Sequence, residues 1–170
     1  ERNQYARGSM SGVKRDYSKN GFRLLTEAEW EYMARAGTTT KYYWGDSDEN
    51  IGEYAHFGNS SLKTVTRTAK KPNAWGIYNT AGNCSEWCTD IYDEYPGGEV
   101  TNPTGKDGSM GENTLIVQRG GSWRHRTSDL MTVTIRAGLV AVQRHHAAGV
   151  TYPGNDYERP GMRIGRGIIE

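Results

Sequence analysis

The clearest hydrophobic pattern in the chain lies in residues 21–37, GFRLLTEAEWEYMARAG. Trp30 and Met33 recur at helical spacing with charged side chains between them, and this period predicts an amphipathic helix. Thr26, followed three residues later by a glutamate, has the form of a capping box, so we expect the helix to begin there and to end at Gly37. The opposite, solvent-facing side is predicted to carry Glu27, Glu31 and Arg35.

Shorter alternating or apolar runs predict strands in much of the remaining chain. They are 38–46 with a turn, 62–69 near a sheet edge, 114–123, 131–138, and 162–169 at the end. Residues 1–20 and 91–113 are polar and rich in turn-forming residues, so we expect an extended lead-in and a surface loop there. The pattern favours a core of short strands with one or two helices.

The stretch Trp75–Asp90, WGIYNTAGNCSEWCTD, interleaves turn-forming residues with large aromatic ones. That mixture predicts a buried irregular loop. Backbone amides in such a loop still need hydrogen-bond partners. The side chains of Asn79, Asn83 and Glu86 are the available partners, and a bound cation is the alternative.

Charge is unevenly placed along the chain. Residues 119–170 hold eight Arg, no Lys and four acidic residues, a balance of +4, and the first 118 residues hold 13 basic and 16 acidic groups, a balance of −3. Arginine favours planar, bidentate contacts over diffuse attraction. The overall net charge of only +1 argues against a nucleic-acid partner.

No apolar run approaches the ~20 residues of a membrane span, so we expect no transmembrane segment in this chain. Because residue 1 is Glu, an upstream signal or lipid anchor is compatible with the sequence. Cys84 and Cys88 are the only cysteines. Two thiols are too few for a zinc site, and we expect them to be free and partly buried.

Four blocks in order carry a family resemblance: 21–37, then NAWGIYNTAGNCSEWCTD, QRGGSW and GMRIGR. Together they resemble the formylglycine-generating enzyme, or sulfatase-modifying factor, superfamily. The resemblance implies an α+β, C-type-lectin-like fold over residues 21–170, with short antiparallel strands and much irregular structure. Residues 1–20 would be the remainder of a truncated N-terminal part.

The departures from the family pattern bear on function. The enzymes of this superfamily have two copper-binding cysteines after the Gly-Gly-Ser block, and here those places fall at about His125 and Leu130. Without these thiolates, a thiol-dependent oxidase cannot work. We therefore predict no catalytic residues and no copper, and the alternative is a formylglycine-generating-type oxidase or its degenerate remnant.

A subset of the superfamily that lacks these two cysteines is similar to the variable proteins of diversity-generating retroelements, and this sequence resembles that subset. The resemblance implies a variable region at about 119–170, displayed outside the cytoplasm on a bacterial cell surface and contacting an unknown protein or surface ligand. Polar and aromatic residues crowd this tail, as in antibody paratopes. The predicted ligand-binding residues are His125, Arg126, Arg144, His145, His146, Tyr152, Asn155, Asp156, Tyr157 and Arg159.

The family resemblance also implies a structural calcium ion in the middle loop. Its ligands would be Asn79, Gly82, Cys84 and Glu86, using side-chain oxygens at the ends and backbone carbonyls between them. The alternative is that Asn79 and Glu86 bond loop amides directly, so that no cofactor is required. A calcium-dependent, carbohydrate-binding lectin is a further functional alternative.

Overall fold

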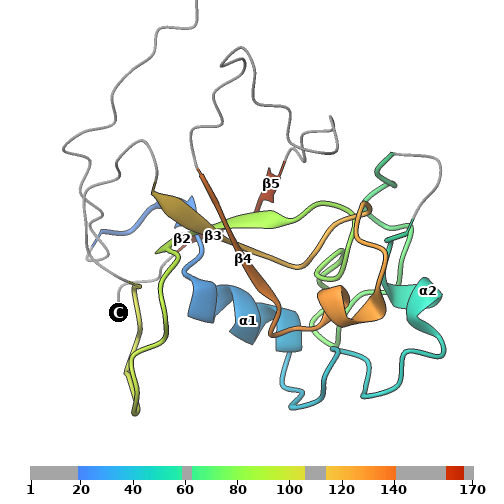
Figure 1. The fold of residues 1–170 in the computed structure, drawn as a ribbon, viewed down its shortest axis with the longest axis horizontal. Coiled ribbons are helices and arrows are strands. Elements are labelled where there is room, and N and C mark those ends of the chain that lie inside the picture. Colours follow the sequence, from blue (N-terminus) through green and yellow to red (C-terminus); the bar gives the residue numbers. More distant parts are fainter. Residues whose placement is uncertain (1–18, 59–62, 106–113, 141–159, 167–170) are drawn as a thin grey trace, which may run out of the picture.

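The computed structural model describes residues 19–58, 63–105, 114–140 and 160–166 (Figure 1). Its elements, in chain order, are β1 (Phe22–Leu24), α1 (Glu27–Arg35), α2 (Ile51–Tyr54), β2 (Glu86–Ile91), β3 (Leu115–Arg119), a 3-10 turn (Ser128–Met131), β4 (Arg136–Val140), β5 (Gly161–Met162) and β6 (Ile164–Arg166). Among these, β1 pairs antiparallel with β6, and four strands form a sheet in the order β4-β3-β2-β5. Only the β2–β5 contact in that sheet is parallel.

Helix α1 begins as the sequence predicts. The Glu29 amide donates to the Thr26 hydroxyl at 3.2 Å, and the Thr26 amide donates back to the Glu29 carboxylate at 2.8 Å, which completes the capping box. The helix ends one residue before the expected position, because Ala36 itself adopts a left-handed conformation with φ 48°. Gly37 follows with φ 92°, so two left-handed residues turn the chain away.

The apolar face of α1 packs against the four-stranded sheet, which Figure 1 shows lying across the helix. Trp30 and Ala34 form a fully buried cluster with Cys88 of β2 and Val117 of β3. A second buried cluster lies under the loops around α2, where Tyr42, Trp44 and Tyr54 stack in sequence. Core packing therefore joins the only long helix of the described residues to the strands that carry the sites below.

The prediction for the polar side of α1 is wrong at Glu27. This carboxylate is 5% exposed and accepts hydrogen bonds from Arg136 at 2.8 Å. The Arg119 guanidinium is also buried and pairs with Glu27 and Glu31. A buried carboxylate requires compensating charge, and here it comes from β3 and β4, distant in sequence from the helix.

Other strand predictions are wrong where side chains form hydrogen bonds with backbone groups that a neighbouring strand would otherwise bind. Residues 38–46 form one isolated bridge and no strand, and the described part of 62–69 is coil and turn, with Val65 N–H bonded to the Asn83 side chain. The predicted strand 131–138 begins only at Arg136, because Arg119 binds the carbonyls before it. The final strand 162–169 is split into β5 and β6 at residue 163, and residues 167–169 lie outside the described part.

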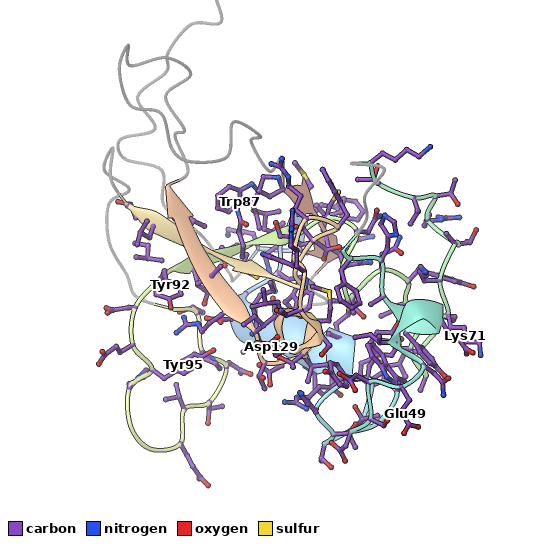
Figure 2. The ribbon with its side chains drawn as sticks, turned by 45° about the vertical axis from the view of Figure 1, so that its right-hand side comes forward. Glu49, Lys71, Trp87, Tyr92, Tyr95 and Asp129 are labelled. Carbon is purple, nitrogen blue, oxygen red and sulfur yellow. The ribbon has the colours of Figure 1, made fainter. Side chains whose placement is uncertain are left out.

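The face of the four-stranded sheet opposite α1 is defined by one row of cross-strand neighbours. Ala137 pairs with Gln118, Gln118 with Trp87, and Trp87 with Met162. The residues next to them in sequence, such as Cys88, Val117 and Arg136, contact α1. Because side chains alternate along a strand, these four residues lie on the opposite side of the sheet, which we call the outer face. Figure 2 shows Trp87 on this side, away from the helix. Ala137 and Met162 at its two ends are exposed.

Candidate functional site

The middle loop is held chiefly by Asn73, a residue that sequence analysis did not single out for this role. Its side-chain amide donates to the carbonyls of Met33 and Ala34 at 2.8 and 3.1 Å, at the end of α1. Its side-chain oxygen accepts from the amides of Trp75 and Ile77 at 3.1 and 3.0 Å. One buried carboxamide thus satisfies two carbonyl groups at the end of α1 and two amide groups of the loop, and it joins the loop to the helix.

Glu86 joins the loop to the C-terminal strands. Its carboxylate accepts two hydrogen bonds from Arg163 at 2.7 and 2.9 Å and one from the Trp30 indole at 2.8 Å. Arg163 also donates to the Tyr78 carbonyl at 3.0 Å. The prediction that Glu86 bonds loop amides directly is therefore wrong within the described residues, because its donors are side chains. Two of the bonds form a bidentate ion pair between β2 and the β5–β6 junction.

Asn79 and Asn83 both adopt left-handed backbone conformations, with φ 58° and 65°. The Asn83 side chain accepts from the Val65 amide at 2.9 Å, and the Asn79 side chain donates to the Arg67 carbonyl at 3.0 Å. Both asparagines thus fasten the segment around residue 65 to the loop. The side-chain oxygen of Asn79 is buried and has no hydrogen-bond partner among the residues described.

A pocket of about 590 Å³, here called the middle pocket, opens beside this loop. Its lining includes Asn79, Asn83, Cys84, Glu86, Met162 and Arg163. The lone Asn79 oxygen is the kind of atom that a hard cation binds, and Glu86 retains lone-pair capacity beyond its three donors. Of the predicted calcium ligands, Asn79, Cys84 and Glu86 line the pocket and Gly82 does not, and the Arg163 guanidinium paired with Glu86 opposes a cation there. Calcium binding at this loop stays a prediction. Within the described ranges, no three His, Cys, Asp or Glu side chains gather as a metal cluster.

Both cysteines are free thiols, as expected. Cys88 lies in the core between α1 and the sheet, and burial raises the pKa of its thiol, so the reactive thiolate is disfavoured. Cys84 is half-buried in the lining of the middle pocket. Neither thiol lies in the lining of the second pocket, where the resemblance places the enzymes' cysteines.

That second pocket, here called the β3–β4 pocket, measures about 210 Å³ and lies where β3 ends and β4 begins. His125 and Leu130 both line it. The Ser122 amide donates to His125 Nδ1 at 2.9 Å, which assigns the proton of the neutral imidazole to Nε2. Gly121 lets the chain pass close, since a Cβ there would lie 2.4 Å from the Leu130 carbonyl oxygen.

The ten predicted ligand-binding residues divide into two groups. His125 is half-buried in the β3–β4 pocket, and Arg126 beside it is exposed. The other eight lie outside the described residues, in the segment 141–159. The strands on either side of that segment, β4 and β5, are the two edges of the four-stranded sheet. Hence the described strands before and after this segment lie at opposite edges of the sheet.

Comparison with known proteins shows the family of this chain. The model of the sulfatase-modifying factor enzyme 1-like domain matches residues 3–163. The chain belongs to this family. The resemblance drawn from the four sequence blocks is thereby confirmed.

Two named proteins illustrate the similarity of this chain to its relatives. The formylglycine-generating enzyme of Streptomyces coelicolor is 38% identical over 116 residues, covering 61% of this chain and 36% of the enzyme. The serine/threonine-protein kinase pkn1 of Chlamydia pneumoniae is 36% identical over 115 residues, covering 65% of this chain and 17% of the kinase. The chain thus spans about a third or less of the length of these two relatives.

Solved structures extend the comparison. Treponema denticola variable protein 1 superposes with a TM-score of 0.67 at 36% identity, covering 75% of this chain and 45% of that one. PvdO from Pseudomonas aeruginosa gives 0.55 at 26% identity, covering 71% and 48%. The predicted C-type-lectin-like fold of the formylglycine-generating type, and the resemblance to variable proteins, are confirmed. None of the described helices has the length and apolar character needed to cross a membrane.

Proposed function

We propose that this chain is a non-catalytic binding protein, in which side chains of residues 119–170 contact a protein or surface ligand on the outside of a bacterial cell. The observation that carries this proposal is the β3–β4 pocket. It is lined by His125 and Leu130. The family resemblance places the two cysteines of the superfamily's oxidases at about these positions. An imidazole and an isobutyl group cannot supply the paired thiolates that the oxidation requires.

The other two thiols do not replace them. Cys88 is buried under α1, and Cys84 lines the middle pocket. The similarity to Treponema denticola variable protein 1 supports the binding function over the degenerate oxidase, although the formylglycine-generating relatives have comparable identity.

The two strands that flank residues 141–159 support the display of variable side chains. Eight of the ten predicted contact residues fall between β4 and β5, the edge strands, so changes there leave the cross-strand pairs of the sheet intact. Retroelement-driven diversification of these codons is part of the proposal. It predicts that the encoding DNA lies near a template copy of its 3′ end that differs only at adenines, beside a reverse-transcriptase gene.

The first experiment is an oxidation assay with a sulfatase-derived cysteine peptide and added copper, with the Streptomyces enzyme as positive control. We expect no formylglycine above the level without protein. Turnover that depends on this chain would overturn the proposal.

The second experiment tests display directly. A surface-displayed library randomised at the ten predicted residues is selected against a model target, hen lysozyme, beside a matched library randomised at ten exposed positions of residues 46–74. We expect binders only from the tail library, with melting temperatures close to that of the parent. Tail libraries that fail to fold, or equal enrichment from both libraries, would count against the proposal.

A further inference from the structure

The β3–β4 pocket contains a buried hydrogen-bond donor with no acceptor in the described part of the chain. Gln118 is 2% exposed. Its side-chain oxygen accepts from the Ser85 hydroxyl at 3.0 Å, which orients the carboxamide. Its Nε2 then has no partner. Buried donors are almost always satisfied, so this group indicates a missing acceptor.

The residues around this donor limit the kind of acceptor that it can bind. Arg119 and Arg136 line the pocket, and among the described lining residues there is no Asp or Glu. Arg119 Nε also lacks a hydrogen bond, since its nearest carboxylate oxygen, on Glu27, is 3.6 Å away. Both guanidinium groups are paired with Glu27 on the α1 side of the sheet, so the donor left on the outer face is Gln118 Nε2. Its strongest acceptor is an anionic oxygen, and a cationic guest offers it none.

The size and walls of the pocket limit the guest further. About 210 Å³ corresponds to about seven water molecules at liquid density. Leu130, Ile135 and Ala137 supply apolar walls. A carboxylate on one or two methylene groups fits within such a space, whereas drug-sized ligands occupy pockets of ~300–1,000 Å³.

Access comes from the outer face. Ala137 is exposed and lies directly opposite Gln118 in the β3–β4 register. A guest can therefore reach the Gln118 amide past a methyl group, and a larger side chain at 137 would cover it.

We propose that the β3–β4 pocket binds a small carboxylate carried by the ligand, with Gln118 Nε2 as the principal donor. This inference rests on the proposed binding function and deepens it. It assigns one anchoring contact to residues of the sheet, separate from the tail side chains.

The test is an NMR titration of the full chain with sodium propionate at constant ionic strength, following the side-chain amide signals of Gln118. These signals are assigned by their loss in Gln118→Met. We expect saturable shifts in the parent and a dissociation constant raised by about tenfold or more in Ala137→Leu, because a lost hydrogen bond to a charged group is of that size. Ala69→Leu, the same change at an exposed position outside the pocket, should bind as the parent does.

Propylammonium, of similar size and opposite charge, should give no saturable shift. Two peptides then distinguish the source of the carboxylate: acetyl-Ala-Glu-Ala-amide offers a side chain, and acetyl-Ala-Ala-Ala offers a free C-terminus. Binding of either supports the inference. If propionate shifts stay linear, as for a pocket that holds only water, or are the same in Ala137→Leu, the inference is overturned.

Different results would overturn the proposed binding function and the proposed carboxylate pocket. Oxidase turnover would overturn the binding function whatever propionate does. Absence of a saturable propionate site, without turnover, would remove only the carboxylate pocket and leave recognition by the tail untouched.

Discussion

Two glycines of the middle loop have nearly the same backbone conformation and very different surroundings. Gly82 has φ +75°, and a Cβ there would lie 2.3 Å from the His56 carbonyl oxygen, whereas Gly76 has φ +74° and open space around it. The pair separates the cost of left-handed strain from the cost of a backbone clash.

Gly76→Ala should lower the free energy of unfolding by about 1–2 kcal/mol, the cost of the left-handed conformation alone. Gly82→Ala should lower it by more, because His56 accepts a hydrogen bond from Asn83 at 2.8 Å and cannot move away without breaking it. Urea denaturation of the parent and both variants measures these changes in the free energy of unfolding. Equal losses would contradict the close approach described for Gly82.

Residue-level signals explain which parts of the site could be predicted. The turn residues of 75–90 correctly indicated an irregular loop, although its last residues, from Glu86, form β2. Its predicted burial is correct for Thr80 to Gly82 but wrong for Trp75, which is 48% exposed. The importance of Asn73 was not apparent, because its four bonds go partly to Met33 and Ala34, 40 and 39 residues away. Nor could the sequence show that Gln118 Nε2 lacks a partner, since that depends on packing.

Helix α1 carries a pH-dependent contact at its first turn. Glu29 accepts two hydrogen bonds from Arg23 at 2.6 Å, and this pairing, more than any other cause, lowers the pKa of Glu29 from its ordinary 4.5. A lowered folded-state pKa means that the pairing stabilises the protein above about pH 4.5 and is lost as the pH falls through the folded value.

Glu29→Gln tests this contact while keeping the capping amide bond available. We expect the variant to be less stable than the parent by ~0.2–1 kcal/mol near pH 7, a small amount because the pair is partly exposed. The difference should shrink toward zero as the pH falls below 4.5. Chemical denaturation from pH 3 to 7 gives the curve, with Glu49→Gln as an exposed control. A difference that does not change with pH would contradict the contact.

At the level of elements, local signals succeeded and long-range pairing did not. The capping box and the 3.6-residue period are local, and α1 forms where they predict. The pairing of β1 with β6 joins Phe22 to Arg166, and the burial of Glu27 depends on Arg136, so neither follows from a local window. Side-chain competition for backbone groups likewise removed two predicted strands.

The whole molecule offers a test of the calcium proposal. An ion bound only by the folded state, present at 100 times its dissociation constant, stabilises by about 2.7 kcal/mol. For a chain of this size that corresponds to a rise of about 5–10 °C in melting temperature. We expect such a rise in calcium relative to EDTA, and its loss in Asn79→Ala.

Magnesium is the matched control, because it binds poorly to sites that demand several protein oxygens. A melting temperature that is the same in calcium and in EDTA would favour the alternative, in which the loop is held by its own hydrogen bonds.

The Arg163–Glu86 pair has a consequence for the evolution of this protein. It lies just after the segment that we propose to vary, and it binds β2, the Tyr78 carbonyl and, through Glu86, the Trp30 indole. Substitutions within 141–159 leave both partners of this ion pair unchanged, so the chain after the segment can still be fixed to β2 by the same contact. Variants that differ in this segment can therefore present different surfaces while the same ion pair keeps the fold.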